Sequence, residues 1–164
     1  MPPKLPAVLI LDNVRSLHNV GAIFRTAEAT GIQEVVLTGL TPVPPRHEID
    51  KTALGALRTL AWRYEPNAAA CVAALKKEGY TAYALELTPT ATILYEAPLT
   101  WPLALVVGHE REGVEPDVLA LCDAHLSLPM HGTSVHSLNV SNATSIALYE
   151  LGRRFWYHGD TSKS

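Results

Sequence analysis

The sequence predicts a single α/β domain in which a parallel β-sheet is covered by helices on both faces. Short apolar runs without polar alternation are typical of strands buried on both faces, and they alternate along the chain with amphipathic segments. The 164 residues are 48% apolar, which is enough to bury one proper core. We expect one domain over residues 1–158 and a frayed tail over residues 159–164.

The first half of the chain gives a strand, a helix, a second strand and a long loop. Residues 7–12 (AVLILD) are continuously apolar and predict the first strand. Residues 20–30 carry apolar side chains at helical spacing and end before a glycine, which predicts a helix. Residues 34–38 (EVVLT) predict the second strand. Residues 39–56 contain three prolines, so we expect irregular structure until about Glu48, and loops of this length are usually functional or mobile.

The second half continues the alternation. It predicts helices over residues 67–78, 113–122 and 139–156, and strands over residues 80–87, 103–108 and 124–128. In parallel sheets of this kind, ligands bind in the crevice at the carboxyl ends of the strands. The loops that follow the strands are therefore the places to look for chemistry.

Charge and composition exclude several classes of protein. The formal net charge of −3 argues against a domain that coats nucleic acid through bulk positive charge, so any RNA contact must be local. The apolar runs are too short for a membrane span or a signal peptide, and we expect a cytoplasmic protein. Cys71 and Cys122 are far apart and are expected to be small buried hydrophobes, with neither a disulfide nor a metal site.

The loop before the last helix is unusually polar. It places five such residues at or near a helix entrance: Ser134, Ser137, Asn139, Ser141 and Asn142. One ordinary helix cap needs one of them, so the cluster indicates either a generously capped helix or a ligand site rich in amides and hydroxyls. The loops over residues 13–31, 108–113 and 129–142 should meet at one edge of the sheet, and they contain neither G-x-G-x-x-G nor a P-loop.

These three stretches resemble the three motifs of the SpoU-type RNA ribose 2'-O-methyltransferases, the TrmH-like members of the SPOUT superfamily. The matching residues are Asn19, Gly21, Arg25, Thr26 and Gly31 in the first motif, Gly108, Glu110 and Gly113 in the second, and Pro129, Met130, Gly132, Ser137, Leu138, Asn139 and Ser141 in the third. The resemblance implies a parallel sheet whose C-terminal third forms a deep trefoil knot, a known exception to the rule against knots. It also implies methylation of a ribose 2'-hydroxyl in tRNA or rRNA.

The resemblance further implies S-adenosylmethionine as the methyl donor, bound within the knot. The expected cofactor-binding residues are Val107, Gly108, His109, Gly113, Leu128, Met130, Ser137, Leu138 and Asn139. Such proteins are typically homodimers that pack through the first and last helices. The last helix here has Ile146 and Tyr149 outside its main apolar stripe of Val140, Ala143, Ala147 and Leu151, and a helix that is apolar on two sides needs two partners.

The expected catalytic residues follow from the same resemblance. Arg25 matches the family's catalytic arginine, and a guanidinium suits a phosphate clamp better than a general base because it stays protonated. Asn19 and Ser137 would orient Arg25 or the ribose, Glu110 would hold the second loop, and Asn139 would serve both the cofactor loop and the active site. For RNA binding we nominate Arg15, Arg25, Arg46 and Lys51.

Some alternatives stay open. His109 either reaches the cofactor or the substrate, or is an exposed turn histidine. His131 and His136 flank the third motif without the carboxylate or thiolate companion that a metal site needs. Besides an enzyme, the chain could be a cofactor-binding RNA module that is non-catalytic alone or needs a partner, or a plain nucleotide-binding domain.

Overall fold

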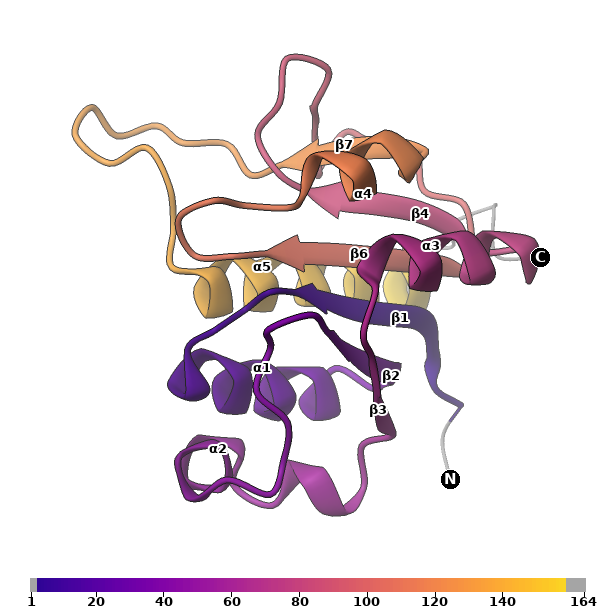
Figure 1. The fold of residues 1–164 in the computed structure, drawn as a ribbon. Coiled ribbons are helices and arrows are strands. Elements are labelled where there is room, and N and C mark those ends of the chain that lie inside the picture. Colours follow the sequence, from indigo (N-terminus) through magenta and orange to yellow (C-terminus); the bar gives the residue numbers. More distant parts are fainter. Residues whose placement is uncertain (1–2, 159–164) are drawn as a thin grey trace.

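The computed structural model describes residues 3–158, which contain one fully parallel sheet (Figure 1). Its strands are β1 (Leu5–Asp12), β2 (Ile32–Thr38), β3 (Trp62–Glu65), β4 (Thr81–Leu85), β5 (Thr92–Ile93), β6 (Leu103–Gly108) and β7 (Ala124–Ser127). The order across the sheet is β3-β2-β1-β6-β4-β7-β5. The helices are α1 (Leu17–Ala29), α2 (His47–Ala53), α3 (Ala68–Lys77), α4 (Pro116–Leu121) and α5 (Val140–Tyr157), with a 3-10 turn η1 (Ala56–Arg58).

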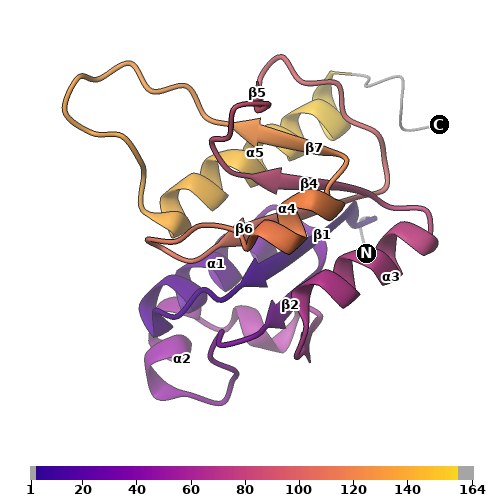
Figure 2. The same ribbon diagram turned by 45° about the horizontal axis from the view of Figure 1, so that its top comes forward.

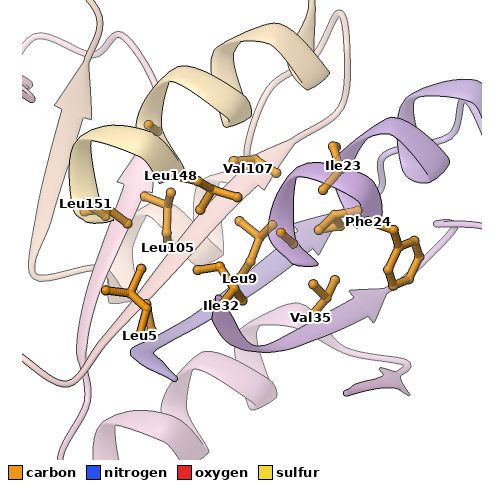
Figure 3. Close-up of a cluster of buried hydrophobic side chains, with 14 of the residues drawn as sticks. Leu5, Leu9, Ile23, Phe24, Ile32, Val35, Leu105, Val107, Leu148 and Leu151 are labelled. Carbon is orange, nitrogen blue, oxygen red and sulfur yellow. The ribbon is translucent and has the colours of Figure 1, made fainter. Parts of the chain in front are cut away.

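Helices cover both faces of the sheet, as the unbroken apolar strands predict (Figure 2). On one face, α1 and α5 pack together over a core that includes Leu9, Leu105 and Leu151 (Figure 3). On the other face, α3 and α4 pack over a second core that includes Val8 and Ile10. Successive residues of β1 thus point into opposite cores, which is the pleat of a strand buried on both sides.

The central pair of strands, β1 and β6, comes from distant parts of the chain. Asp12 at the end of β1 lies opposite Gly108 at the end of β6. The loop that leads into α1 and the loop that follows β6 therefore start side by side. Since β4 pairs with β6 and β7 pairs with β4, the carboxyl ends of all four strands share one edge.

The predicted strands and helices are confirmed with shifts of a few residues at their ends, but four elements, α2, η1, β3 and β5, were not predicted. The irregular loop ends where expected, yet α2 and η1 then occupy residues that were read as loop. In α2, Ile49 and Ala53 are buried, so this short helix is held by packing against α1 rather than by its own propensity. The edge strands β3 and β5 are short and partly or fully exposed, and such strands lack a clear apolar signature.

Within residues 3–158, no helix is both long and apolar enough to cross a membrane. The tail predicted over residues 159–164 lies outside the described residues. Both cysteines are free thiols. Burial raises the pKa of Cys71 to about 11 and that of Cys122 to about 12, which suits packing rather than chemistry.

Candidate active site

A cavity of about 270 Å³ opens at the carboxyl edge of the sheet, between the segments that follow β4, β6 and β7 and the start of α5. Eight of the nine residues expected to bind the cofactor line it: Val107, Gly108, His109, Gly113, Leu128, Met130, Ser137 and Leu138. The lining also includes residues that the sequence did not single out for this role: Leu85, Glu86, Leu87, Arg111, Leu126, Ser127, His136, Val140 and Ala143. Val140 and Ala143 thus face the cavity, whereas the sequence placed them in the main apolar stripe of the last helix.

The turn that follows β6 forms one wall and is tightly built. Its ends pair through the backbone, with the His109 amide donating to the Gly113 carbonyl at 3.1 Å and the Gly113 amide donating to the His109 carbonyl at 2.9 Å. The His109 ring closes the turn, because its Nδ1 accepts from the amides of Arg111 and Glu112 at 3.0 and 3.1 Å. His109 is therefore both a turn residue and part of the cavity wall.

Two glycines allow this turn. A Cβ on Gly108 would lie 2.3 Å from the carbonyl carbon of Gly113 and from the amide nitrogen of Val114, so the strand end and the turn approach too closely for any side chain. Gly113 has φ +72°, in the left-handed region that glycine adopts without strain. The backbone is thereby left bare where it faces the cavity.

A chain of hydrogen bonds joins the three motif segments. The Asn19 Nδ2 donates to Glu110 Oε1 at 3.3 Å, and Asn139 Nδ2 donates to Asn19 Oδ1 at 3.3 Å. Glu110 also accepts from the amides of Ser16 at 3.2 Å and Arg15 at 3.5 Å. Burial alone would raise the pKa of Glu110, but these donors outweigh it and the pKa lies below its ordinary value. Glu110 thus binds the start of α1 rather than only its own loop.

Asn139 is the N-cap of α5, and this role explains several of the polar residues before the last helix. Its Oδ1 accepts from the amide of Ser141 at 2.9 Å, from the amide of Asn142 at 3.3 Å and from the Ser141 hydroxyl at 2.6 Å. Capping therefore accounts for Asn139, Ser141 and Asn142. It does not account for Ser137, which is exposed in the loop and lines the cavity, whereas Asn139 does not.

Arg25 is exposed on α1, off the apolar stripe as expected, but it does not line the cavity. Asn19 and Ser137 were expected to orient either Arg25 or the ribose, and among the described residues neither side chain bonds Arg25. The side chain of Asn19 instead bonds Glu110 and Asn139. Among residues 3–158 the Arg25 guanidinium makes no hydrogen bond or ion pair, so it is available to an anion from outside.

The other basic residues nominated for RNA lie on the α1 side. Arg15 is exposed just before α1, and Arg46 and Lys51 are exposed at the start and in the last turn of α2. Arg46 makes a long ion pair with Glu48 at 3.9 Å, both side chains being about half exposed, so this pair holds it weakly. The helices α1 and α2 pack against each other (Figure 1), so these residues belong to neighbouring elements.

Glu86 is the carboxylate that motif reasoning missed. It follows β4 directly and lines the cavity, and its Oε2 accepts from the Val114 amide at 3.3 Å. Burial raises its pKa. In the sequence, the only indication of a role for Glu86 was its position at the end of an apolar strand, at the edge of the sheet where ligands are expected. His136 also lines the cavity, His131 does not, and no group of residues suited to a metal ion occurs in the described part of the chain.

A second hollow lies between the end of α1 and the outer side of α5. Its lining includes Tyr95, Ile146, Tyr149, Trp156 and Tyr157. Ile146 is 39% exposed and Tyr149 is 60% exposed, so α5 carries a second apolar side that residues 3–158 leave partly uncovered.

Sequence comparison identifies relatives along nearly the whole chain. The model of a family described as the SpoU rRNA Methylase family matches residues 6–149. The tRNA (guanosine(18)-2'-O)-methyltransferase of Thermus thermophilus is 35% identical over 146 residues, which are 89% of this chain and 74% of that protein. The 23S rRNA (guanosine-2'-O-)-methyltransferase RlmB of Vibrio parahaemolyticus is 35% identical over 153 residues, 92% of this chain and 60% of that protein. The chain spans about six tenths of the length of several of these curated relatives.

Solved structures share the fold. An S-adenosylmethionine-bound rRNA methyltransferase of Sinorhizobium meliloti superimposes with a TM-score of 0.84 at 26% identity, covering 94% of this chain and 58% of that one. A structure concerned with the 2-OH methylation of C/U34 on tRNA superimposes with a TM-score of 0.80 at 29% identity, covering 91% of this chain and 95% of that one.

Proposed function

Because the chain belongs to the SpoU rRNA methylase family, we propose that it methylates the 2'-hydroxyl of a ribose in tRNA or rRNA, with S-adenosylmethionine as the donor. The observation that carries this proposal is the series of hydrogen bonds Asn139–Asn19–Glu110. These bonds join the turn after β6 and the start of α5, which border the cavity, to α1, the helix that contains Arg25. A plain nucleotide-binding domain would need the cavity but not this connection.

The cavity fits the donor in size and in chemistry. Its volume is close to the lower end of the roughly 300–1,000 Å³ that is usual for small-molecule sites. Its walls combine apolar side chains such as Leu85, Leu126 and Leu128 with exposed backbone at Gly108 and Gly113. The apolar side chains suit the adenine ring of the donor, and the backbone amides and carbonyls suit its polar groups. When bound, the donor supplies a methyl group on a positively charged sulfur. We propose that residues 107–109, Gly113, Leu128, Met130 and residues 137–139 hold it.

Within this chain, Arg25 has the properties of a phosphate clamp. Arginine keeps its charge at neutral pH and matches a phosphate with two parallel N–H donors. The side chain is exposed and has no partner among the described residues, so binding an RNA phosphate would break no existing contact. In this proposal Arg25 fixes the backbone of the RNA, and Ser137 and Asn139 position the ribose at the mouth of the cavity.

Further contacts to RNA are assigned to Arg15, Arg46 and Lys51, which are exposed at the neighbouring helices α1 and α2. A tRNA substrate is supported by the Thermus thermophilus relative and by the structure concerned with C/U34, and an rRNA substrate is supported by the Vibrio parahaemolyticus relative. The location that we propose for this activity is the cytoplasm. The net charge of −3 favours one alternative, a cofactor-binding RNA module that depends on a partner for RNA affinity or catalysis.

Two further features of the family are proposed for this chain. The exposed side of α5 at Ile146 and Tyr149 suits a second copy of the chain, which gives a homodimer. The chain reaches β7 from α4 on one face of the sheet and continues to α5 on the other face (Figure 2). We propose that this path forms the deep trefoil knot of the family.

The test is methyl transfer from labelled S-adenosylmethionine to total unmodified RNA, followed by mapping of the modified nucleotide. We expect transfer by the parent chain and loss of transfer in Arg25→Ala, with donor affinity unchanged by calorimetry. Arg58→Ala is the matched control, because Arg58 is an exposed arginine on η1 outside the proposed site. Donor binding without transfer to any RNA would favour the partner-dependent module, and absence of donor binding would refute the proposal.

A further inference from the structure

Glu86 places a carboxylate against the cavity from the end of β4. Two neighbours fix it there. The Val114 amide donates to its Oε2 at 3.3 Å, and a Cβ on Gly113 would lie 2.5 Å from its Oε1, so glycine at that position makes room for the carboxylate. Glu86 is thus built into the wall rather than extended into solvent.

Among residues 3–158, no lysine, arginine or histidine forms an ion pair with the carboxylate of Glu86. Its Oε1 accepts no hydrogen bond from the residues that the structure describes. His125, on the neighbouring strand β7, directs Nδ1 to the Thr88 hydroxyl at 2.8 Å and Nε2 to the Leu119 carbonyl at 2.9 Å. The histidine is therefore occupied elsewhere.

The other carboxylate of the cavity wall is in a different situation. Both oxygens of Glu110 accept from donors at the start of α1, namely the amides of Arg15 and Ser16 and the side chain of Asn19. The remaining charged or titratable lining residues are His109, Arg111 and His136. His109 closes its own turn through Nδ1, and Arg111 is exposed. Glu86 is consequently the carboxylate whose charge is left for a ligand.

We propose that Glu86 is a specificity-determining residue that favours the cationic methyl donor over its neutral product. The inference rests on the proposed function. In the reaction the sulfur–carbon bond breaks, a bond forms between that carbon and the 2'-oxygen, and the hydroxyl proton passes to solvent. A sulfonium cation thereby becomes a neutral thioether. A fixed negative charge in the cavity wall attracts the sulfonium of the donor and does not attract the neutral thioether of the product.

This role is distinct from general binding of the ligand. The donor and its product, S-adenosylhomocysteine, share the adenine, the ribose and the amino acid, and they differ only by one methyl group and one charge. A residue that contacts a shared part affects both affinities alike. A residue that acts through the charge on the sulfur changes the affinity for the donor and leaves the affinity for the product unchanged. It therefore favours exchange of the product for fresh donor after each transfer.

The experiment compares both ligands by calorimetry on the parent chain, Glu86→Gln and Glu112→Gln. Glutamine keeps an acceptor for the Val114 amide and removes only the charge. Glu112 is the matched control, because it is an exposed carboxylate in the turn after β6 and does not line the cavity. We expect Glu86→Gln to weaken S-adenosylmethionine binding roughly 5- to 20-fold, a Coulomb effect discounted for partial exposure, with S-adenosylhomocysteine affinity within about 2-fold.

Unchanged affinity for the product shows that the cavity of the variant is intact, so a folding defect cannot imitate the expected result. Equal losses for both ligands, or no loss for the donor, would overturn the inference while leaving the proposed function in place. A parent chain that binds neither ligand would overturn both.

Discussion

The side-chain amide of Asn139 donates to Oδ1 of Asn19 at 3.3 Å, across 120 positions of the sequence. Asn139 caps α5 and Asn19 lies in the first turn of α1, so this bond fixes the starts of the two helices that flank the proposed site. The side-chain nitrogen of the same Asn19 donates to Glu110 in the turn after β6. Three loops that are far apart in the chain are thereby held as one unit.

The lowered pKa of Glu110 makes this unit sensitive to acid. Because the folded-state pKa lies below the ordinary value of 4.5, the carboxylate stabilises the fold above that value, and the contribution is lost as the pH falls through the folded pKa. We expect Glu110→Gln to lower the free energy of unfolding by about 1 kcal/mol at pH 7, given partial exposure. The difference from the parent should shrink below pH 4.5, as measured by urea unfolding across pH. A difference that is constant with pH would contradict this account.

The connection through Glu110 also shows where sequence reasoning stops. The apolar runs at β1 and β6 and the spacing of α1 and α5 predicted the central fold, because burial on two faces leaves a direct mark on composition. The glycines and polar residues of the three loops then marked the correct edge of the sheet. No pattern along the chain shows that Glu110 pairs with Asn19, since the pairing depends on β1 and β6 being neighbours.

The residues that were missed share a physical cause. The helix α2 is held by packing against α1, where Gly21 leaves room for Thr52, and a contact of this kind is invisible to local propensity. Glu86 belongs to no motif, and only the position of β4 between β6 and β7 brings it to the cavity. Arg25 was placed correctly on the exposed side of its helix, but the bonds of Asn19 to Glu110 and Asn139 could not be predicted, because they join loops that are distant in the sequence.

The close approach at Gly108 gives a test of the cofactor loops. A methyl group there would collide with the backbone of Gly113, so Gly108→Ala must displace the turn that walls the cavity. We expect at least about a tenfold loss of S-adenosylmethionine affinity by calorimetry and a destabilisation of roughly 1–3 kcal/mol by urea unfolding. Gly132→Ala is the control, since open space surrounds that position. Comparable affinity in the two variants would show that the turn is not part of the binding site.

The exposed apolar side of α5 gives a test of assembly. If a second copy covers Tyr149, the parent chain should sediment as a dimer at micromolar concentration, and Tyr149→Arg should shift it toward monomer because a buried charge would be unpaired. Leu40→Arg serves as the control, because Leu40 is similarly exposed but lies in the loop after β2, away from α5. A monomeric parent, or an equal shift in both variants, would refute an interface at α5.

The last prediction concerns how an acidic domain holds RNA. The proposed patch contains four cationic side chains, Arg15, Arg25, Arg46 and Lys51, all of them exposed. Log affinity falls with log salt by about 0.9 per neutralised phosphate on a duplex and about 0.7 on a single strand, so the patch should give a slope of roughly −2 to −4. Arg46 is held only by a long ion pair with Glu48 and can leave it for a phosphate at little cost.

Replacing Arg46 and Lys51 together by alanine should therefore weaken RNA binding and reduce the magnitude of the slope by roughly 1.4 to 1.8, the share of two phosphates. Donor affinity should not change, because neither residue lines the cavity. The matched control replaces Lys4 and Lys77, two exposed lysines outside the patch, and removes the same net charge from the molecule. If the control lowers the affinity as much as the patch variant, bulk charge governs binding. If neither variant changes affinity or slope, RNA is held elsewhere, and a partner protein that supplies the contact becomes the better explanation.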